Sequence, residues 1–96
     1  MVLYVLKGAP GITALGITAS KKVGKSVRRN RLKRLVRENY RLYEGYIRTG
    51  SFFVFVIRAQ NGPAPDFYDI RSEMRGLLGR AGAFDGEKWE SSRSGA

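Results

Sequence analysis

The feature that most constrains this chain is a long segment in which apolar residues recur at helical spacing, with cations between them. The spacing predicts a helix that begins near Lys25 or Ser26 and ends at about Ile47, after an extended approach over residues 20–24. Its apolar side comprises Leu32, Leu35, Val36, Tyr40, Tyr43 and Ile47. Its opposite side gathers Asn30, Lys33, Arg34, Arg37 and Arg41. One side therefore belongs to a protein core, and the other faces water or a polyanion.

The rest of the chain predicts three strands and a second helix. Residues 2–6 and 12–19 are strand-like runs joined by a turn rich in glycine and proline, which predicts a hairpin. Residues 51–58 are almost continuously apolar, which suits the middle of a sheet. Asp66 is placed to cap a helix over residues 67–80. The apolar stripe of that helix comprises Phe67, Ile70, Met74, Leu77 and Leu78. This order predicts an α+β fold, a small mixed sheet packed with helices.

Size and composition predict one intracellular domain. The chain has 96 residues, too few for two separate cores, so one domain is expected over residues 1–82, followed by a polar, disordered tail over 83–96. Cysteine and histidine are absent, which excludes disulfides, thiolate or imidazole metal ligands and an imidazole general base. The longest apolar run, residues 52–57, is too short to cross a bilayer, and the N-terminus does not resemble a signal peptide. A cytoplasmic location is expected.

The net charge of +10 is concentrated in one segment. All eight acidic residues lie at Glu38 or later, whereas ten of the 18 cations precede it, nearly all between Lys21 and Arg37. Arg29, Lys33, Arg37 and Arg41 follow one another at one-turn spacing, and Arg34 is likewise expected to lack an acidic partner. Like charges at that spacing repel by about a few tenths of a kcal/mol each. Such a ladder indicates a partner whose phosphates neutralise it.

The same residues bear on other possible functions. Gly24-Lys25-Ser26 lies where a Walker A loop would start its helix, but Ala19 stands where that motif needs glycine. A membrane surface would compete with the core for the helix's apolar side. A sheet with aromatic residues beside a basic helix favours single-stranded RNA over DNA. The acidic residues form no spaced cluster typical of an active site. A ribosomal or ribosome-assembly protein stays open as the main alternative, and a nuclease that acts alone as another.

The central motif resembles a known family. Residues 20–25, followed by Arg29-Asn30-Arg31-Leu32-Lys33-Arg34 and Arg37-Glu38, resemble the signature of the bacterial ribonuclease P protein family, and the similarity runs over residues 2–82. The resemblance implies a left-handed βαβ crossover, where the general rule predicts a right-handed one. It implies a non-catalytic subunit of an endoribonuclease that promotes maturation of the tRNA 5′ end. It further implies that Mg²⁺ is bound through the RNA subunit and not by protein side chains alone.

The resemblance also assigns residues to two surfaces. Those expected to face the catalytic RNA are Lys21, Lys22, Lys25, Arg29, Arg31 and Arg34. Those expected to line a groove for the single-stranded 5′ leader of precursor tRNA are Tyr4, Thr18, Asn30, Lys33 and Arg37. Family members carry a basic N-terminal helix and a short strand ahead of the segment that begins here at Val2. Without them, the exposed sheet face is expected to allow self-association.

Overall fold

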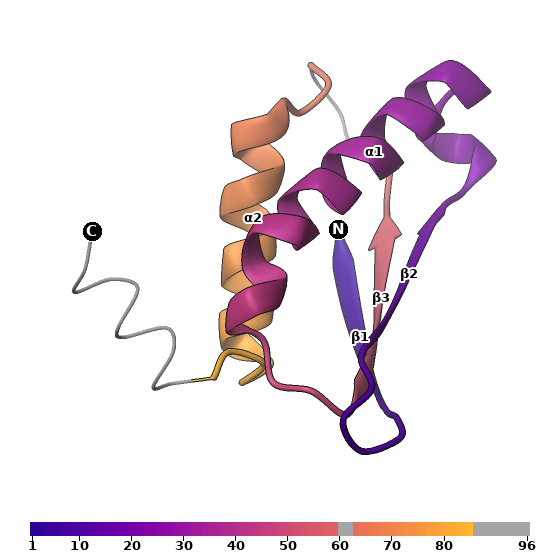
Figure 1. Cartoon of the computed structure of the whole chain (residues 1–96). Helices are drawn as coiled ribbons and strands as arrows, with labels where there is room; N and C mark the ends of the chain where they lie inside the picture. The colour runs from indigo at the N-terminus through magenta and orange to yellow at the C-terminus, as the bar shows by residue number, and fades with distance from the viewer. Residues whose placement is uncertain (60–62, 86–96) are drawn as a thin grey trace.

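The computed structural model describes residues 1–59 and 63–85. Its elements are β1 (Val2–Lys7), β2 (Ala14–Ala19), the 3₁₀ turn η1 (Lys21–Val23), α1 (Ser26–Tyr43), the 3₁₀ turn η2 (Glu44–Tyr46), β3 (Ser51–Ile57) and α2 (Phe67–Arg80). Figure 1 shows a small three-stranded sheet with the two helices beside it. The predicted α+β fold is confirmed.

Strand β3 lies in the middle of the sheet, between β1 and β2. It pairs antiparallel with β1, where Val54 lies opposite Tyr4, and parallel with β2, where Val54 lies opposite Gly16. The central position predicted for β3 is confirmed, but the predicted hairpin of β1 with β2 is wrong. Because β3 is apolar on both faces, it is better buried with a neighbour on each side than at an edge.

The loop over residues 8–13 makes this arrangement possible. It joins two strands that are two strand spacings apart, about 10 Å. The backbone N–H of Gly8 donates to the carbonyl of Gly50 (2.9 Å), and the N–H of Gly50 donates to the carbonyl of Ile12 (3.0 Å). The start of β3 is thereby tied to the loop that passes across it.

Helix α1 connects the parallel strands β2 and β3. In Figure 1 both strands run upward, α1 lies in front of the sheet, and β3 lies to the left of β2, so the crossover is left-handed. Crossovers between parallel strands of one sheet are right-handed in about 98% of cases. The hand implied by the family resemblance is therefore confirmed, and the general rule does not hold here.

The predicted start of α1 is confirmed at Ser26, but its end and the segment ahead of it differ from the prediction. The helix ends at Tyr43, before the predicted end at Ile47, and one 3₁₀ turn follows. Gly45 lies in that turn, where its low helix propensity favours termination. At the other end, residues 21–23 form a 3₁₀ turn where an extended approach was expected.

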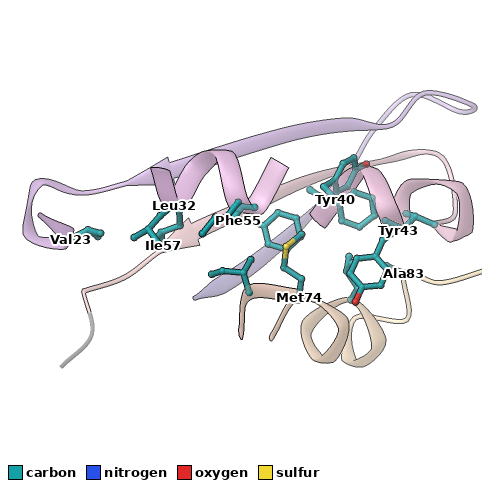
Figure 2. Close-up of a cluster of buried hydrophobic side chains, with 14 residues drawn as sticks. Val23, Leu32, Tyr40, Tyr43, Phe55, Ile57, Met74 and Ala83 are labelled. Atoms are coloured by element: carbon teal, nitrogen blue, oxygen red, sulfur yellow. The ribbon is translucent and has the colours of Figure 1, made fainter. Parts of the chain in front are cut away.

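The core lies between the sheet and the helices (Figure 2). From the sheet it takes Phe53, Phe55 and Ile57. From the helices and their flanking turns it takes Val23, Leu32, Leu35, Val36, Tyr40, Tyr43, Ile47, Ile70, Met74, Leu78 and Ala83. The apolar side predicted for α1 is confirmed in full. In α2, Phe67 and Leu77 are only partly buried.

The folded structure extends past the predicted boundary at residue 82. Ala83 is buried, and Phe84 forms a β-bridge with Ile47 and an edge-on contact with the Tyr43 ring, at 5.7 Å between centroids. The N–H of Asp85 donates to the carbonyl of Tyr46 (2.7 Å). The first three residues of the predicted tail therefore pack on the domain, because the apolar side chains of Ala83 and Phe84 complete its core and the backbone of Asp85 is hydrogen-bonded to η2. The remainder of that predicted tail, residues 86–96, lies outside the described residues.

Asn39 is a fully buried polar side chain that joins the two helices. Its Nδ2 donates to the carbonyls of Leu35 (3.0 Å) and Phe67 (3.1 Å), and the hydroxyl of Tyr43 donates to the carbonyl of Arg71 (3.0 Å). Both long-range bonds reach the first turns of α2. They hold the start of α2 against α1.

Asn39→Ala is therefore expected to lower the free energy of unfolding by about 2 kcal/mol, because it removes two hydrogen bonds from a dry site. Denaturant unfolding followed by circular dichroism measures this. The matched control is Asn30→Ala, which truncates an exposed asparagine of the same helix and should change the value by about 0.5 kcal/mol or less. Equal unfolding midpoints for the two variants would contradict the structural role of Asn39.

Candidate nucleic-acid interface

The cations of α1 are exposed because the opposite side of the helix is anchored in the core. Leu32 and Val36 are 3% and 0% exposed. Ahead of the helix, Val23 is buried, which leaves Lys21 and Lys22 of the same 3₁₀ turn in solvent. Gly24 then redirects the chain with a φ of +142°, a conformation that L side chains rarely adopt. These anchors place the lysines of η1 next to the cationic start of α1.

A Cβ atom at Gly24 would lie 2.8 Å from Cδ of Arg28. Glycine is therefore favoured here chiefly by the backbone conformation, because the exposed side chain of Arg28 is free to shift away from a Cβ atom. Lys25 follows as the N-cap residue of α1 and is exposed. The loop-to-helix junction thus brings Lys21, Lys22 and Lys25 together at one end of the helix.

The outward side of α1 carries one group of predicted site residues. Asn30, Arg31 and Arg34 are all exposed, and with Val27 they line a shallow depression along the helix. Val27 is 80% exposed, so it adds an apolar contact point among the polar side chains. The structure therefore places Asn30, which was assigned to the leader groove, with Arg31 and Arg34, which were assigned to the catalytic RNA.

A second row of cations follows the flank of α1 that faces β2. Arg29, Lys33 and Arg37 lie one turn apart, and Arg37 shares a hollow with Thr13 and Leu15. Arg29 and Lys33 are half-buried, and Nε of Arg29 is buried without a hydrogen-bond partner among the described residues. This row borders the edge of the sheet.

Charge compensation along α1 is sparse in the described part of the chain. Nε of Arg34 lies 3.7 Å from Oε1 of Glu38, so the expectation that Arg34 has no acidic partner is wrong: an i, i+4 pair was available. Both side chains are largely exposed, and such pairs contribute little. The ladder formed by Arg29, Lys33, Arg37 and Arg41 makes no salt bridge within residues 1–59 and 63–85. No acidic side chain in these ranges offsets its mutual repulsion.

The sheet face away from the helices carries the remaining predicted residues. The strand register puts Tyr4 and Thr18 on the same face as Val54 and Val56, opposite the buried Phe53 and Phe55. Tyr4 is 50% exposed and Thr18 is exposed. The structure thus brings these two residues to one open surface.

Phe52 and Gly16 shape that open face. A Cβ atom at Gly16 would lie 3.2 Å from the ring of Phe52, so the ring covers the glycine. Phe52 is 37% exposed and Leu6 is 55% exposed on the same face. Apolar and aromatic side chains of this kind suit the flat faces of unstacked bases.

Tyr40 lies beneath the cationic flank but contributes no charge to it. Its ring lies 6.5 Å from those of Phe53 and Phe55, between centroids. Burial raises the pKa of the Tyr40 hydroxyl above its usual value, and the carboxylate of Glu44 adds to the rise. The phenol is therefore neutral near pH 7.

No three histidine, cysteine, aspartate or glutamate side chains come together as a possible metal site within the described ranges. No helix there has the length and apolar character needed to cross a membrane.

A cationic helix packed across a small mixed sheet defines a basic α+β protein of the nucleic-acid-binding class. The family model described as Ribonuclease P matches residues 1–82. The chain is 43% identical over 86 residues to the ribonuclease P protein component of Clostridium botulinum (strain Loch Maree), which covers 88% of this chain and 77% of the relative. It is 43% identical over 96 residues to that of Clostridium perfringens (strain SM101), which covers 92% and 75%.

Solved structures agree with this match. A Staphylococcus aureus RNase P protein mutant with defective mRNA degradation activity superimposes with a TM-score of 0.74 at 28% identity, over 85% of this chain and 69% of the other. The RNase P protein from Thermotoga maritima gives 0.68 at 32% identity, over 81% and 74%. The chain belongs to the ribonuclease P protein family. It is accordingly an RNA-binding component of tRNA processing.

Proposed function

We propose that this chain is the non-catalytic protein subunit of ribonuclease P, which binds the catalytic RNA and the 5′ leader of precursor tRNA. The observation that carries the proposal is the row of Arg29, Lys33, Arg37 and Arg41 on α1, which forms no salt bridge with an acidic side chain among the described residues. Phosphates of a folded RNA would neutralise it and would release condensed counterions.

The contact with the catalytic RNA is assigned to the junction of η1 and α1 and to the outward side of the helix. It comprises Lys21, Lys22, Lys25, Arg29, Arg31 and Arg34. Arginine suits this role because its planar guanidinium donates two parallel hydrogen bonds to a phosphate. The lysines act as point charges at the end of the helix.

The contact with the leader is assigned to the open sheet face and the flank of α1 beside β2. Tyr4 offers a ring for stacking, and Thr18 a hydroxyl for hydrogen bonds. Lys33 and Arg37 would follow the phosphates along the sheet edge. Asn30 lies between the two surfaces and could serve either RNA.

Cleavage itself is assigned to the RNA subunit, with Mg²⁺ bound there and not by protein side chains alone. The protein would act in the cytoplasm by adding positive charge where two polyanions meet, which lowers the Mg²⁺ concentration that they need. Without RNA, the apolar sheet face around Leu6 and Phe52 would permit self-association of the chain, measurable by sedimentation.

Reconstitution tests the proposal. The chain is added to a bacterial ribonuclease P RNA and precursor tRNA at low Mg²⁺, and mature 5′ ends are quantified. Stimulation of the RNA supports the proposal. Cleavage by the protein alone would show a self-sufficient nuclease instead. RNA binding without stimulation would favour a ribosomal or ribosome-assembly role.

The proposed leader contact predicts a loss of affinity for precursor tRNA that depends on the length of the leader. In Lys33→Gln/Arg37→Gln, KM for precursor tRNA is expected to rise at least about tenfold at 0.1 M salt, because two single-strand phosphate contacts disappear. The rise should shrink for a precursor whose leader is one nucleotide long. The control Arg48→Gln/Arg80→Gln removes two exposed cations elsewhere and should leave KM nearly unchanged. A rise that is independent of leader length would contradict the assignment.

A further inference from the structure

The charges of α2 are separated onto two flanks. Arg71 and Arg75 lie one turn apart with Tyr68 on one side of the helix, whereas Asp69 and Glu73 lie on the other side. From Glu38 onward the sequence holds equal numbers of acidic and basic residues, so the net charge of this part of the chain does not reveal the separation. One flank of α2 is therefore cationic and aromatic.

That flank forms one wall of a groove of about 490 Å³ between the two helices. The groove is lined by Leu42, Tyr46, Tyr68, Arg71, Ser72 and Arg75. Its floor is Tyr43, which is buried and donates its hydroxyl hydrogen bond to the carbonyl of Arg71 (3.0 Å). The same bond fixes one wall of the groove to its floor, so the hollow is built into the helix packing.

The groove is distinct from the interface described above. Leu42 lies 16 residues along α1 from Ser26, which corresponds to about 24 Å at 1.5 Å per residue. The groove thus lies at the C-terminal end of α1, beside α2, whereas the cationic junction with η1 lies at the opposite end of the helix (Figure 1).

The groove offers two kinds of recognition at once. Two guanidinium groups one turn apart suit a phosphate, and both arginines are exposed. Tyr68 is 68% exposed and Leu42 is 51% exposed, so an aromatic ring and an apolar side chain stand open beside those charges. An aromatic surface next to paired arginines is the combination by which proteins bind unstacked nucleotides. The volume lies within the range of about 300–1,000 Å³ usual for small-molecule pockets.

We propose that this groove binds one unpaired nucleotide of an RNA, with its phosphate on Arg71 and Arg75 and its base on Tyr68. An acidic peptide would also satisfy the arginines but would leave the open tyrosine ring without a planar partner. The inference rests on the proposed function for the identity of the RNA, and it adds a second, separate contact to it.

Two variants of the full chain test the groove against ribonuclease P RNA. Arg71→Gln/Arg75→Gln is expected to weaken binding about 25-fold at 0.1 M salt and to lower the slope of log affinity against log salt by about 1.4, the value for two single-strand phosphate contacts. Tyr68→Leu is expected to weaken binding about tenfold with the slope unchanged, because it removes stacking and no charge. Arg71→Gln alone should lower the slope by about 0.7.

Matched controls separate the groove from general charge and from exposed apolar surface elsewhere. Arg48→Gln/Arg80→Gln removes two exposed cations outside the groove, and Ile12→Ala truncates an exposed apolar side chain in the loop between β1 and β2. Circular dichroism melting verifies that each variant folds. The proposal would be overturned if the groove variants bound RNA as well as these controls do. It would also be overturned if polyglutamate protected the Tyr68 side chain from chemical modification better than RNA does.

Photocrosslinking distinguishes this inference from the proposed function. An unstructured oligouridylate carrying 4-thiouridine is expected to crosslink to Tyr68, and the crosslink should disappear in Arg71→Gln/Arg75→Gln. If the chain fails to stimulate ribonuclease P RNA but this crosslink forms, the proposed function fails and the groove stands. If stimulation occurs and no crosslink reaches Tyr68, the groove alone is refuted.

Discussion

Replacing Arg29, Arg31 and Arg34 together by glutamine is expected to weaken binding of ribonuclease P RNA about 500-fold at 0.1 M salt. Each lost phosphate contact removes about 0.9 from the slope of log affinity against log salt concentration, so three contacts remove about 2.7. Helix α1 should stay folded, because none of the three side chains belongs to the buried core. Equilibrium binding measured over a series of salt concentrations gives both the affinity and the slope.

The control for this prediction is Lys7→Gln/Arg48→Gln/Arg80→Gln. It removes the same charge, from +10 to +7, at three exposed positions outside the cationic side of α1. A loss of about tenfold or less is expected, since distant charges act only through the screened field of the protein. Equal losses in both triple variants would mean that total charge, and not this side of α1, binds the RNA.

The elements of the fold that depend on burial could be predicted from the sequence. The apolar spacing of α1 and the continuous apolar run of β3 each state which side must be covered, and the structure covers both. The hairpin of β1 with β2 was wrong because a short loop indicates only that two strands run in opposite directions. It does not show that β3, far later in the chain, inserts between them. The hand of the crossover is likewise absent from local patterns.

The candidate site, like the fold, could be predicted from the sequence only in part. Concentrated charge marks α1 directly, but the cationic flank of α2 is hidden because Asp69 and Glu73 balance it in any count. Asn39 carried a signal that composition overlooks. It lies three residues after Val36 and four before Tyr43, inside the apolar stripe, where an amide must find buried partners. A helical wheel that marks polar as well as apolar residues would have revealed both the cationic flank of α2 and the position of Asn39 within the apolar stripe of α1.

Phe55→Ala is expected to lower the free energy of unfolding by about 4 kcal/mol, the largest loss from any single truncation proposed for this chain. Phe55 has no exposed surface, lies at the centre of β3 and packs edge-on against Tyr40, with 6.5 Å between ring centroids. A domain of this size has a total stability of about 5–14 kcal/mol, so the variant would be marginal. Thermal and denaturant unfolding measure the loss.

The matched control is Phe52→Ala, on the same strand but on the open face of the sheet. Phe52 is 37% exposed, so the same truncation is expected to cost only about 1 kcal/mol. Ribonuclease P RNA should raise the melting temperature of Phe55→Ala in proportion to the logarithm of its concentration, because the RNA binds only the folded chain. Since the cations of α1 are displayed only while its apolar side stays in the core, stability and RNA affinity are linked in this variant. Equal destabilisation by the two truncations would show that the helices do not cover the face of the sheet on which the interface depends.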